Sequence, residues 1–178
     1  MEIVSEKQFK LIVKRLCYEL IENYGDFTDT VLVGIQPRGS FLLKRLLKEL
    51  EKITNQPAPA NGVLDTTFFR DDFRRREATL IPSQTKMEHV IENKKVVLVD
   101  DVLYTGRTIR SAMDAMLAFG RPEKVELLVL IDRRFSRDLP IEPNYVGKSV
   151  DTIVSQRVEV EWEQEDGKDS VILFTQEN

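Results

Sequence analysis

The chain has 178 residues, of which 42% are hydrophobic and 31% are charged, a balance typical of a folded globular protein and too apolar for a disordered one. Its one cysteine and one histidine exclude an intrachain disulfide framework and a zinc site built from several such ligands. The formal net charge is −4, and acids outnumber bases most strongly in residues 157–178, so the charge of the remaining chain does not argue against an anionic ligand.

The first predicted element is a helix near the N-terminus. Apolar residues within 9–21 follow the i, i+3, i+4 spacing of one buried helix face. Ser5 and Gln8 can form a capping box at its start, and Gly25 is a suitable stop. We interpret Cys17, on the apolar face, as a core residue.

A buried strand and a second helix follow. The short apolar run 31–35 is typical of a central parallel strand that is covered on both faces. A break at residues 36–39 separates it from a second helical rhythm over 42–50. Residues 55–62 then predict a loop that contains proline, and residues 63–69 predict a strand.

The middle of the chain predicts a long connection, two strands and a helix. Residues 70–93 have no clean period, and connections of this length within compact domains are usually functional lids or disordered. We expect a strand over 95–99, a helix over 108–118 that buries Met113 among its apolar residues, and another strand over 125–131.

The C-terminal part predicts a different kind of sheet. Residues 158–162 and 171–174 alternate apolar and polar side chains around Asp166-Gly167, which is the pattern of an antiparallel hairpin. We interpret Trp162 as a core residue and His89 as an incidental loop residue.

Strands that alternate with helices predict an α/β fold, here a mostly parallel twisted sheet flanked by helices, with a flexible lid segment and a C-terminal antiparallel hairpin. We expect residues 1–178 to form a single domain. No apolar run approaches the ~18 residues of a membrane span and no secretory signal is visible, so we expect a cytoplasmic protein with no membrane partner. Ligands of such sheets bind beyond the carboxyl ends of the strands, which directs attention to residues 36–39, 100–108 and 132–137.

The most informative stretch is residues 96–108, where four apolar residues end in the neighbouring carboxylates Asp100 and Asp101. Two adjacent acids repel each other and lose hydration at a strand end, so they need a cation, a donor set or a ligand. A vicinal diol suits them, because its hydroxyls can donate to two carboxylates. For an isolated acidic pair, a solvated strand end is the alternative interpretation.

The next four residues, Thr105-Gly106-Arg107-Thr108, complement the carboxylates. They offer backbone N–H groups at a helix N-terminus, two hydroxyls, and a glycine that allows close approach of a ligand, which together suit a phosphate. Carboxylates for a sugar followed by donors for a phosphate predict a clamp for a ribose 5-phosphate.

This stretch resembles the phosphoribosyl pyrophosphate signature of type I phosphoribosyltransferases. The form Val-Asp-Asp-Val-Leu-Tyr-Thr-Gly-Arg-Thr is similar to the pyrimidine-operon attenuator/uracil phosphoribosyltransferase family. The similarity covers nearly the whole chain, with further matching segments in the expected order at residues 33–35, 38–39, 69–72, 120–122, 132–133, 139–141 and 145–148. The resemblance implies a type I phosphoribosyltransferase-like fold and a homodimer or larger homo-oligomer.

The resemblance also implies roles for residues at matching positions. The catalytic residues would be Asp100, Asp101 and Arg38. The ribose 5-phosphate loop would consist of Val102, Leu103, Tyr104, Thr105, Gly106, Arg107 and Thr108, and the pyrophosphate loop of Gln36, Pro37, Arg38 and Gly39. Arg70 would belong to the lid, and the base would be held by Asp132, Arg133 and Val158.

The implied reaction transfers the phosphoribosyl group of phosphoribosyl pyrophosphate (PRPP) to uracil, giving UMP and pyrophosphate through an oxocarbenium-like transition state. Mg²⁺ would bind mainly through the substrate diphosphate, with no protein side chain assigned as its ligand. The chain departs from the family at two places. Gln36 replaces a common lysine, so one charge contact to the diphosphate is missing or supplied elsewhere, and residues 132–137 replace a shorter segment containing Gly and His, which leaves the preferred base open.

The family also regulates pyrimidine operons by binding leader mRNA. In this chain Tyr18, Asn23 and Glu142 stand where RNA-binding members tend to carry histidine or arginine, so we expect attenuation to be weakened or lost. Two alternatives stay open: a uridine-nucleotide-sensing RNA-binding attenuator without significant turnover, and a phosphoribosyltransferase for another base.

Overall fold

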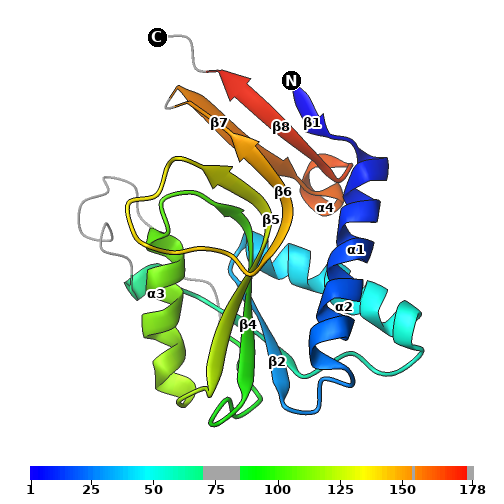
Figure 1. The fold of residues 1–178 in the computed structure, drawn as a ribbon, viewed down its shortest axis with the longest axis vertical. Helices are drawn as coiled ribbons and strands as arrows, with labels where there is room; N and C mark the ends of the chain where they lie inside the picture. Colours follow the sequence, from blue (N-terminus) through cyan, green and yellow to red (C-terminus); the bar gives the residue numbers. More distant parts are fainter. Residues whose placement is uncertain (70–84, 154, 176–178) are drawn as a thin grey trace.

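The computed structural model describes residues 1–69, 85–153 and 155–175, and it confirms the predicted α/β class. Figure 1 shows the arrangement of its helices and strands. Along the chain the elements are β1 (Glu2–Val4), α1 (Glu6–Tyr24), β2 (Thr30–Ile35), α2 (Arg38–Thr54), β3 (Asn61–Leu64), the 3₁₀ helix η1 (Thr67–Phe69), β4 (Lys95–Leu103), α3 (Arg107–Met116), the 3₁₀ helix η2 (Leu117–Phe119), β5 (Lys124–Arg134), β6 (Tyr145–Asp151), β7 (Gln156–Glu161), α4 (Glu163–Asp166) and β8 (Ser170–Thr175).

The larger sheet separates two hydrophobic cores. Within the described residues it has five strands in the order β3-β2-β4-β5-β6, and every neighbouring pair is parallel. Successive strand residues face opposite sides, so Val97 and Val99 of β4 pack with α1 and α2, whereas Val96 and Leu98 pack with α3. Figure 1 shows α1 and α2 on one side of the sheet and α3 on the other. The central strands are therefore apolar on both faces, as their sequences predict.

The local signals of the first helix are confirmed. Ser5 and Gln8 form the predicted capping box, and Gly25 ends α1 with a φ of +58°. Cys17 is fully buried on the face that packs against α2. Burial raises the pKa of its thiol to about 12, which fits an unreactive core side chain.

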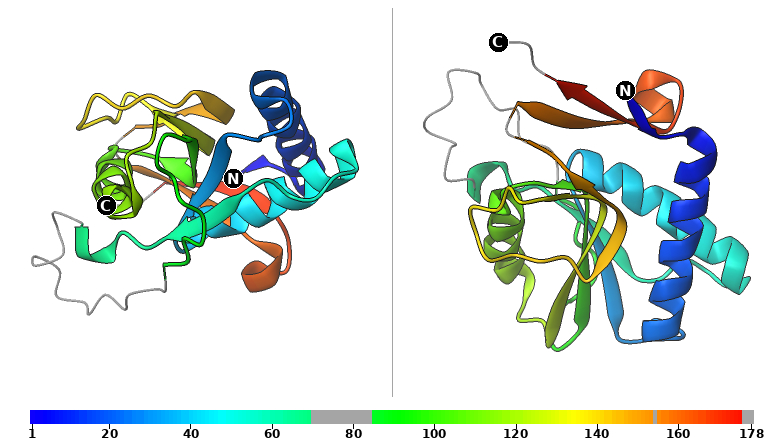
Figure 2. Two further views of the ribbon diagram at one scale, coloured as in Figure 1. Left: turned by 90° about the horizontal axis from the view of Figure 1, so that it is seen from below. Right: turned by 45° about the horizontal axis from the view of Figure 1, so that its top comes forward.

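The smaller sheet contains the predicted C-terminal hairpin. Among the described residues it consists of β1, β8 and β7, with β8 antiparallel to both neighbours. Trp162, the residue after β7, is fully buried, with its ring centre 5.6 Å from that of Phe9 on α1 and 5.7 Å from that of Phe41 on α2. Both views in Figure 2 show this sheet close to the start of the chain. The prediction of Trp162 as a core residue is confirmed, and the residue ties the smaller sheet to both helices.

Several predicted strand limits are wrong. The strand expected over 63–69 is β3 and ends at Leu64, because the Asp65 side chain accepts hydrogen bonds from the Thr67 backbone (2.9 Å) and hydroxyl (2.6 Å) and turns the chain into η1. Strands β4 and β5 run further than expected, since their parallel ladder continues to the pair Leu103 and Asp132. Strands β1 and β6 were not predicted.

The helix expected over 108–118 is α3 followed by η2, and one of its predicted core residues is wrong. Met113 is 36% exposed. The buried arc of α3 is centred on Ala112 and includes Ser111 and Ala115, so Met113 lies past the edge of that arc. The predicted lid falls mostly on residues 70–84, outside the described residues, and it stays a prediction. No helix in the described parts of the chain combines the length and apolar character that membrane crossing requires.

A buried carboxylate lies near the amino ends of the parallel strands. Glu126 of β5 is 8% exposed and accepts hydrogen bonds from the hydroxyls of Tyr24 on α1 and Tyr145 on β6, the latter at 2.8 Å. Lys124 forms an ion pair with its other oxygen. Burial by itself raises the pKa of Glu126, but the hydrogen bonds from Lys124, Tyr24 and Tyr145 outweigh it and hold the pKa below the ordinary 4.5.

We expect Glu126→Gln to lower the free energy of unfolding at pH 7 by about 1–3 kcal/mol, because hydrogen bonds to a charged group are lost. A carboxylate with a lowered pKa stabilises the fold above the pKa of the unfolded chain, and this contribution disappears as the pH falls through the folded value. Urea unfolding at several pH values should therefore show the difference from wild type shrinking below about pH 4.5. The exposed Glu123→Gln serves as control; an equal loss there would contradict the prediction.

Candidate functional site

The predicted strand exits meet at the carboxyl end of the larger sheet. The ladder places Leu103, at the end of β4, beside Asp132 of β5. Gly39, in the first turn of α2, packs against β4: a Cβ added there would lie 3.1 Å from Asp100 Cα and 3.3 Å from Asp100 Oδ1. The segments that follow β2, β4 and β5 thus form one region around the acidic doublet.

Both carboxylates of the doublet are buried inside β4, not in the loop beyond it. Asp100 is 7% exposed and Asp101 is 9% exposed. The Asp101 N–H donates to Asp100 Oδ1 (2.9 Å), and the Val102 N–H donates to Asp101 Oδ1 (2.8 Å). Burial raises the pKa of Asp101, although the Arg38 charge and the Val102 N–H lower it in part. A diol or cation at this position would offset the desolvation of these charges.

The first predicted loop lies at the start of α2. The Gln36–Pro37 peptide bond is cis. Arg38 Nη1 donates to the Val160 carbonyl of β7 (3.2 Å), and its Nη2 lies 3.8 Å from the Glu159 carboxylate. The Arg38 side chain therefore joins the start of α2 to β7.

Val158, the base contact that was predicted on β7, is mostly buried. It is 7% exposed and belongs to the hydrophobic cluster on the α1 and α2 side of the larger sheet. Arg70, the predicted lid residue, lies outside the described residues.

The predicted phosphate loop ends at the N-terminus of α3. Gly106 is the residue before the helix and has a φ of +91°, a conformation that other residues rarely adopt. The Thr105 carbonyl accepts hydrogen bonds from the backbones of Asp138 (3.0 Å) and Leu139 (3.2 Å), and Arg107 Nε forms an ion pair with the Asp138 carboxylate (3.0 Å). This loop is braced by the segment that follows β5, while the first turn of α3 supplies the backbone donors that suit an anion.

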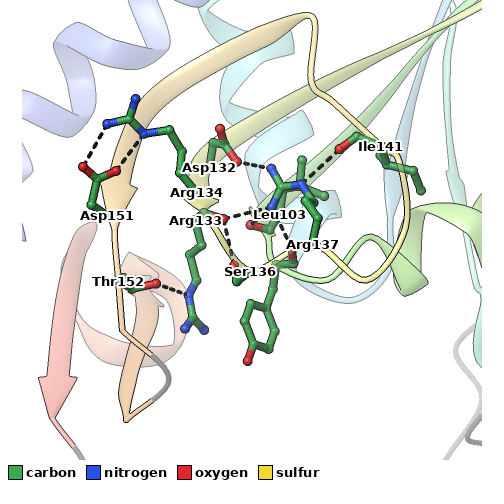
Figure 3. A network of polar contacts seen from close by, with 10 residues as sticks. Leu103, Asp132, Arg133, Arg134, Ser136, Arg137, Ile141, Asp151 and Thr152 are labelled. Carbon is green, nitrogen blue, oxygen red and sulfur yellow. Dashed lines mark hydrogen bonds and ion pairs between the residues drawn. The ribbon is translucent and has the colours of Figure 1, made fainter.

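Two of the predicted base contacts, Asp132 and Arg133, lie on β5 itself. Arg133 is 6% exposed; its Nε donates to the Thr152 hydroxyl (3.1 Å) and its Nη2 to the Gln156 carbonyl (2.8 Å). The guanidinium lies 4.0 Å from the centre of the Tyr104 ring, a close cation–π contact. Figure 3 shows Arg133 and Thr152 pointing toward one another, with Asp132 directed to the opposite side, toward Arg137.

Sequence reasoning missed two features of this region. Arg137 pairs with the Asp132 carboxylate and contacts several backbone carbonyls, although no spacing rule had marked it. A cavity of about 570 Å³ opens beside the first loop, lined in part by Gln36, Lys44, Lys86 and His89. His89, interpreted as an incidental loop residue, lines this cavity, and only its position in the folded chain could have indicated that.

The donor set fits a magnesium ion that is shared with a bound phosphate compound. Among the described residues, no group of three or more His, Cys, Asp or Glu side chains could hold a metal by itself. Mg²⁺ typically takes one or two carboxylates, keeps several waters, and completes its shell with substrate phosphates. Asp100 and Asp101 are the oxygen donors that suit such an ion.

Comparison with known proteins agrees with this geometry. The chain matches the model of the phosphoribosyl transferase domain family over residues 1–165. It is 42% identical over 173 residues to the Bifunctional protein PyrR of Microcystis aeruginosa, covering 97% of this chain and 96% of that protein. It is also 42% identical to the Pyrimidine operon regulatory protein of Lactococcus lactis, covering 97% and 95%. The crystal structure of the hypoxanthine phosphoribosyltransferase of Trypanosoma cruzi has the same fold, with a TM-score of 0.71 at 14% identity over 99% of this chain and 97% of that one.

Proposed function

From the premise that this chain belongs to the phosphoribosyl transferase domain family, we propose that it transfers the phosphoribosyl group of PRPP to uracil, giving UMP and pyrophosphate. The observation that carries the proposal is the buried doublet Asp100-Asp101 on β4. This strand leads through a short loop to Gly106 at the N-terminus of α3. This arrangement offers carboxylates for a sugar diol and backbone donors for its phosphate.

In this proposal each part of the site acts on a different part of PRPP. Asp100 and Asp101 accept hydrogen bonds from the ribose hydroxyls and place negative charge near the developing oxocarbenium ion. Residues 102–108 anchor the 5′-phosphate, and Arg38, Gln36 and Gly39 face the leaving diphosphate. The bond from carbon 1 to the diphosphate oxygen breaks, a bond to a uracil ring nitrogen forms, and the proton of that nitrogen passes to the released diphosphate or to solvent. When Mg²⁺ is bound through the diphosphate, it supplies further neutralisation of the leaving group.

The remaining predicted residues have proposed places around the base and the diphosphate. Asp132, Arg133 and Val158 belong to the base side, and Arg70 to a lid that excludes water from the diphosphate. We further propose that residues 1–178 act as one domain in a cytoplasmic homodimer or larger homo-oligomer.

A panel of free bases tests the proposed function. Wild-type protein is incubated with PRPP and Mg²⁺ and with uracil, orotate, hypoxanthine, guanine or adenine, and both nucleotide and diphosphate are measured. We expect kcat/KM for uracil to exceed that for the purines by about 10²-fold or more, since a site that hydrogen-bonds one base leaves polar groups unpaired with another. Faster reaction with a different base would reassign the substrate. Binding of PRPP or UMP without release of diphosphate would instead identify a sensor.

A regulatory role is the second candidate function, because a relative that is 42% identical to this chain carries the name Pyrimidine operon regulatory protein. RNA binding needs a basic surface. On α1, however, Lys10 pairs with Glu6 at 2.5 Å and Arg15 pairs with Glu19, so acids on the same helix offset two of its cations. Filter binding of a labelled leader transcript at several salt concentrations separates the roles: nanomolar, salt-dependent binding supports the regulator.

A further inference from the structure

We propose that Arg137 is a positioning residue that fastens the end of β4 to the end of β5, and so sets the shape of the phosphate loop. The inference rests on the proposed function, because it assigns Arg137 a part in binding PRPP. Arg137 lies in the segment after β5, and its contacts are with proposed site residues and the backbone rather than with the acidic doublet.

The guanidinium of Arg137 connects the carboxyl ends of two neighbouring strands. Its Nη1 donates to the carbonyls of Tyr104 (2.6 Å) and Arg133 (2.9 Å), with the Leu103 carbonyl at 3.4 Å. Leu103 ends β4, Arg133 lies near the end of β5, and Tyr104 is the first residue of the phosphate loop beyond β4. One side chain therefore fixes the point where the phosphate loop leaves the sheet.

The other donors of Arg137 act on the side of the site where the base is proposed to bind. Nη2 forms an ion pair with the carboxylate of Asp132, which is buried on β5, and Nε donates to the Ile141 carbonyl (3.0 Å). Figure 3 shows the Arg137 guanidinium between Asp132 and Ile141. Ile141 in turn packs against Gly106, where an added Cβ would lie 3.2 Å from Ile141 Cδ1. The segment that carries Arg137 thus supports both ends of the phosphate loop.

Tyr104, at this junction, is contacted by two arginines. Arg137 binds its backbone carbonyl, and Arg133 covers its ring at 4.0 Å. The next residue, Thr105, accepts hydrogen bonds at its carbonyl from the backbones of Asp138 and Leu139. The start of the phosphate loop is therefore positioned by the segment after β5 rather than by β4 alone.

Only arginine can make this set of contacts. It presents five N–H donors in a rigid fork, whereas lysine is a point charge with three donors on a flexible stem. The Arg137 side chain is 21% exposed, so removing it takes a partly buried donor from the Asp132 carboxylate and from the carbonyls of Tyr104 and Ile141. A displacement of the loop by 1 Å can lower the rate about 10²-fold.

The test compares Arg137→Gln, Arg137→Lys and Arg134→Gln. Arg134, three residues earlier, makes a two-pronged ion pair with Asp151 (2.7 and 3.0 Å) that is half exposed and away from the loop, so it is the matched control. We expect kcat/KM for PRPP to fall about 10²-fold in both Arg137 variants and to stay unchanged in Arg134→Gln. Added guanidinium ion should restore part of the activity of Arg137→Gln, and amide hydrogen exchange over residues 103–108 should speed up in both Arg137 variants.

Each outcome decides one point. Full activity in Arg137→Lys would mean that Arg137 only balances the charge of Asp132, and it would overturn the proposal. Unchanged activity and exchange in Arg137→Gln would overturn it as well. If Arg137→Gln does not fold, Arg137→Lys, which keeps the charge and most of the volume, carries the test. If wild-type protein forms no nucleotide from any base, the proposed function fails, while the exchange rates of residues 103–108 still decide the positioning role.

Discussion

The variant that carries both Asp100→Asn and Asp101→Asn is expected to lose nearly all nucleotide formation while remaining folded. Asparagine keeps the shape of each side chain but removes the negative charge that faces the developing oxocarbenium ion and accepts from the ribose hydroxyls. Loss of one preorganised group of this kind lowers rates by 10²–10³-fold, so we expect a decrease of about 10³-fold or more for the pair.

The same variant should be at least as stable as wild type at neutral pH. Burial raises the pKa of Asp101, so its ionised form is less favourable in the folded state than in the unfolded chain. The neutral amide that Asp101→Asn introduces removes this penalty at pH 7. The gain should shrink as the pH falls through the raised pKa of Asp101, because the wild-type carboxyl then becomes neutral too. Thermal unfolding at several pH values measures this effect independently of activity.

A matched control changes the net charge equally at the opposite end of the sheet. Asp26 and Asp29 are exposed in the loop before β2, where Asp29 pairs with Lys94 at 2.7 Å. Asp26→Asn combined with Asp29→Asn should leave nucleotide formation unchanged. If the Asp100 and Asp101 variant retained full activity, the doublet would have no role in binding the ribose, and the proposed clamp would be lost.

The parts of the fold that the sequence predicts well are those whose evidence is local. Periodic apolar residues predict α1, and continuous apolar runs predict β2 and the cores of β4 and β5. Strand β1, by contrast, has three residues and forms only because it pairs with β8 near the other end of the chain. Strand β6 carries Gly147, Lys148 and Ser149 in its middle, a composition that indicates no strand; Gly147 fits there because the Leu130 carbonyl lies against it.

The candidate site likewise combines features that the local sequence predicts with features that it does not. Asp100, Asp101 and Gly106 are predictable because their roles depend on one strand, one turn and one helix start. The extension of β4 through the doublet was missed, because polar residues at a strand end usually indicate a loop; here the ladder with β5 continues past them. Arg137 contacts Arg133 and Ile141 nearby in the sequence, but Leu103 and Tyr104 lie more than 30 residues earlier, so no local pattern could reveal that it joins β4 to β5.

Gly39→Ala is expected to displace the first loop and to lower kcat/KM about 10²-fold, a large effect for one methyl group. Gly39 lies in the first turn of α2, where an added Cβ would overlap the Val99 carbonyl oxygen and lie 3.1 Å from Asp100 Cα. Both are backbone atoms of the central strand β4, which neighbouring strands hold on both sides. The strand cannot move away, so the start of α2 must shift instead, and Arg38 shifts with it.

Overpacking of this kind should also lower the free energy of unfolding by about 1–3 kcal/mol. Gly167→Ala separates the two effects, because Gly167 has a φ of +80° and an added Cβ there meets nothing within 4 Å. That variant should lose about 1 kcal/mol through backbone strain and keep its kcat/KM. Steady-state kinetics and urea unfolding of both variants provide the comparison. If Gly39→Ala lost stability like Gly167→Ala but kept full activity, the reaction would not depend on close packing between α2 and the acidic doublet, and Arg38 would have no fixed place in the site.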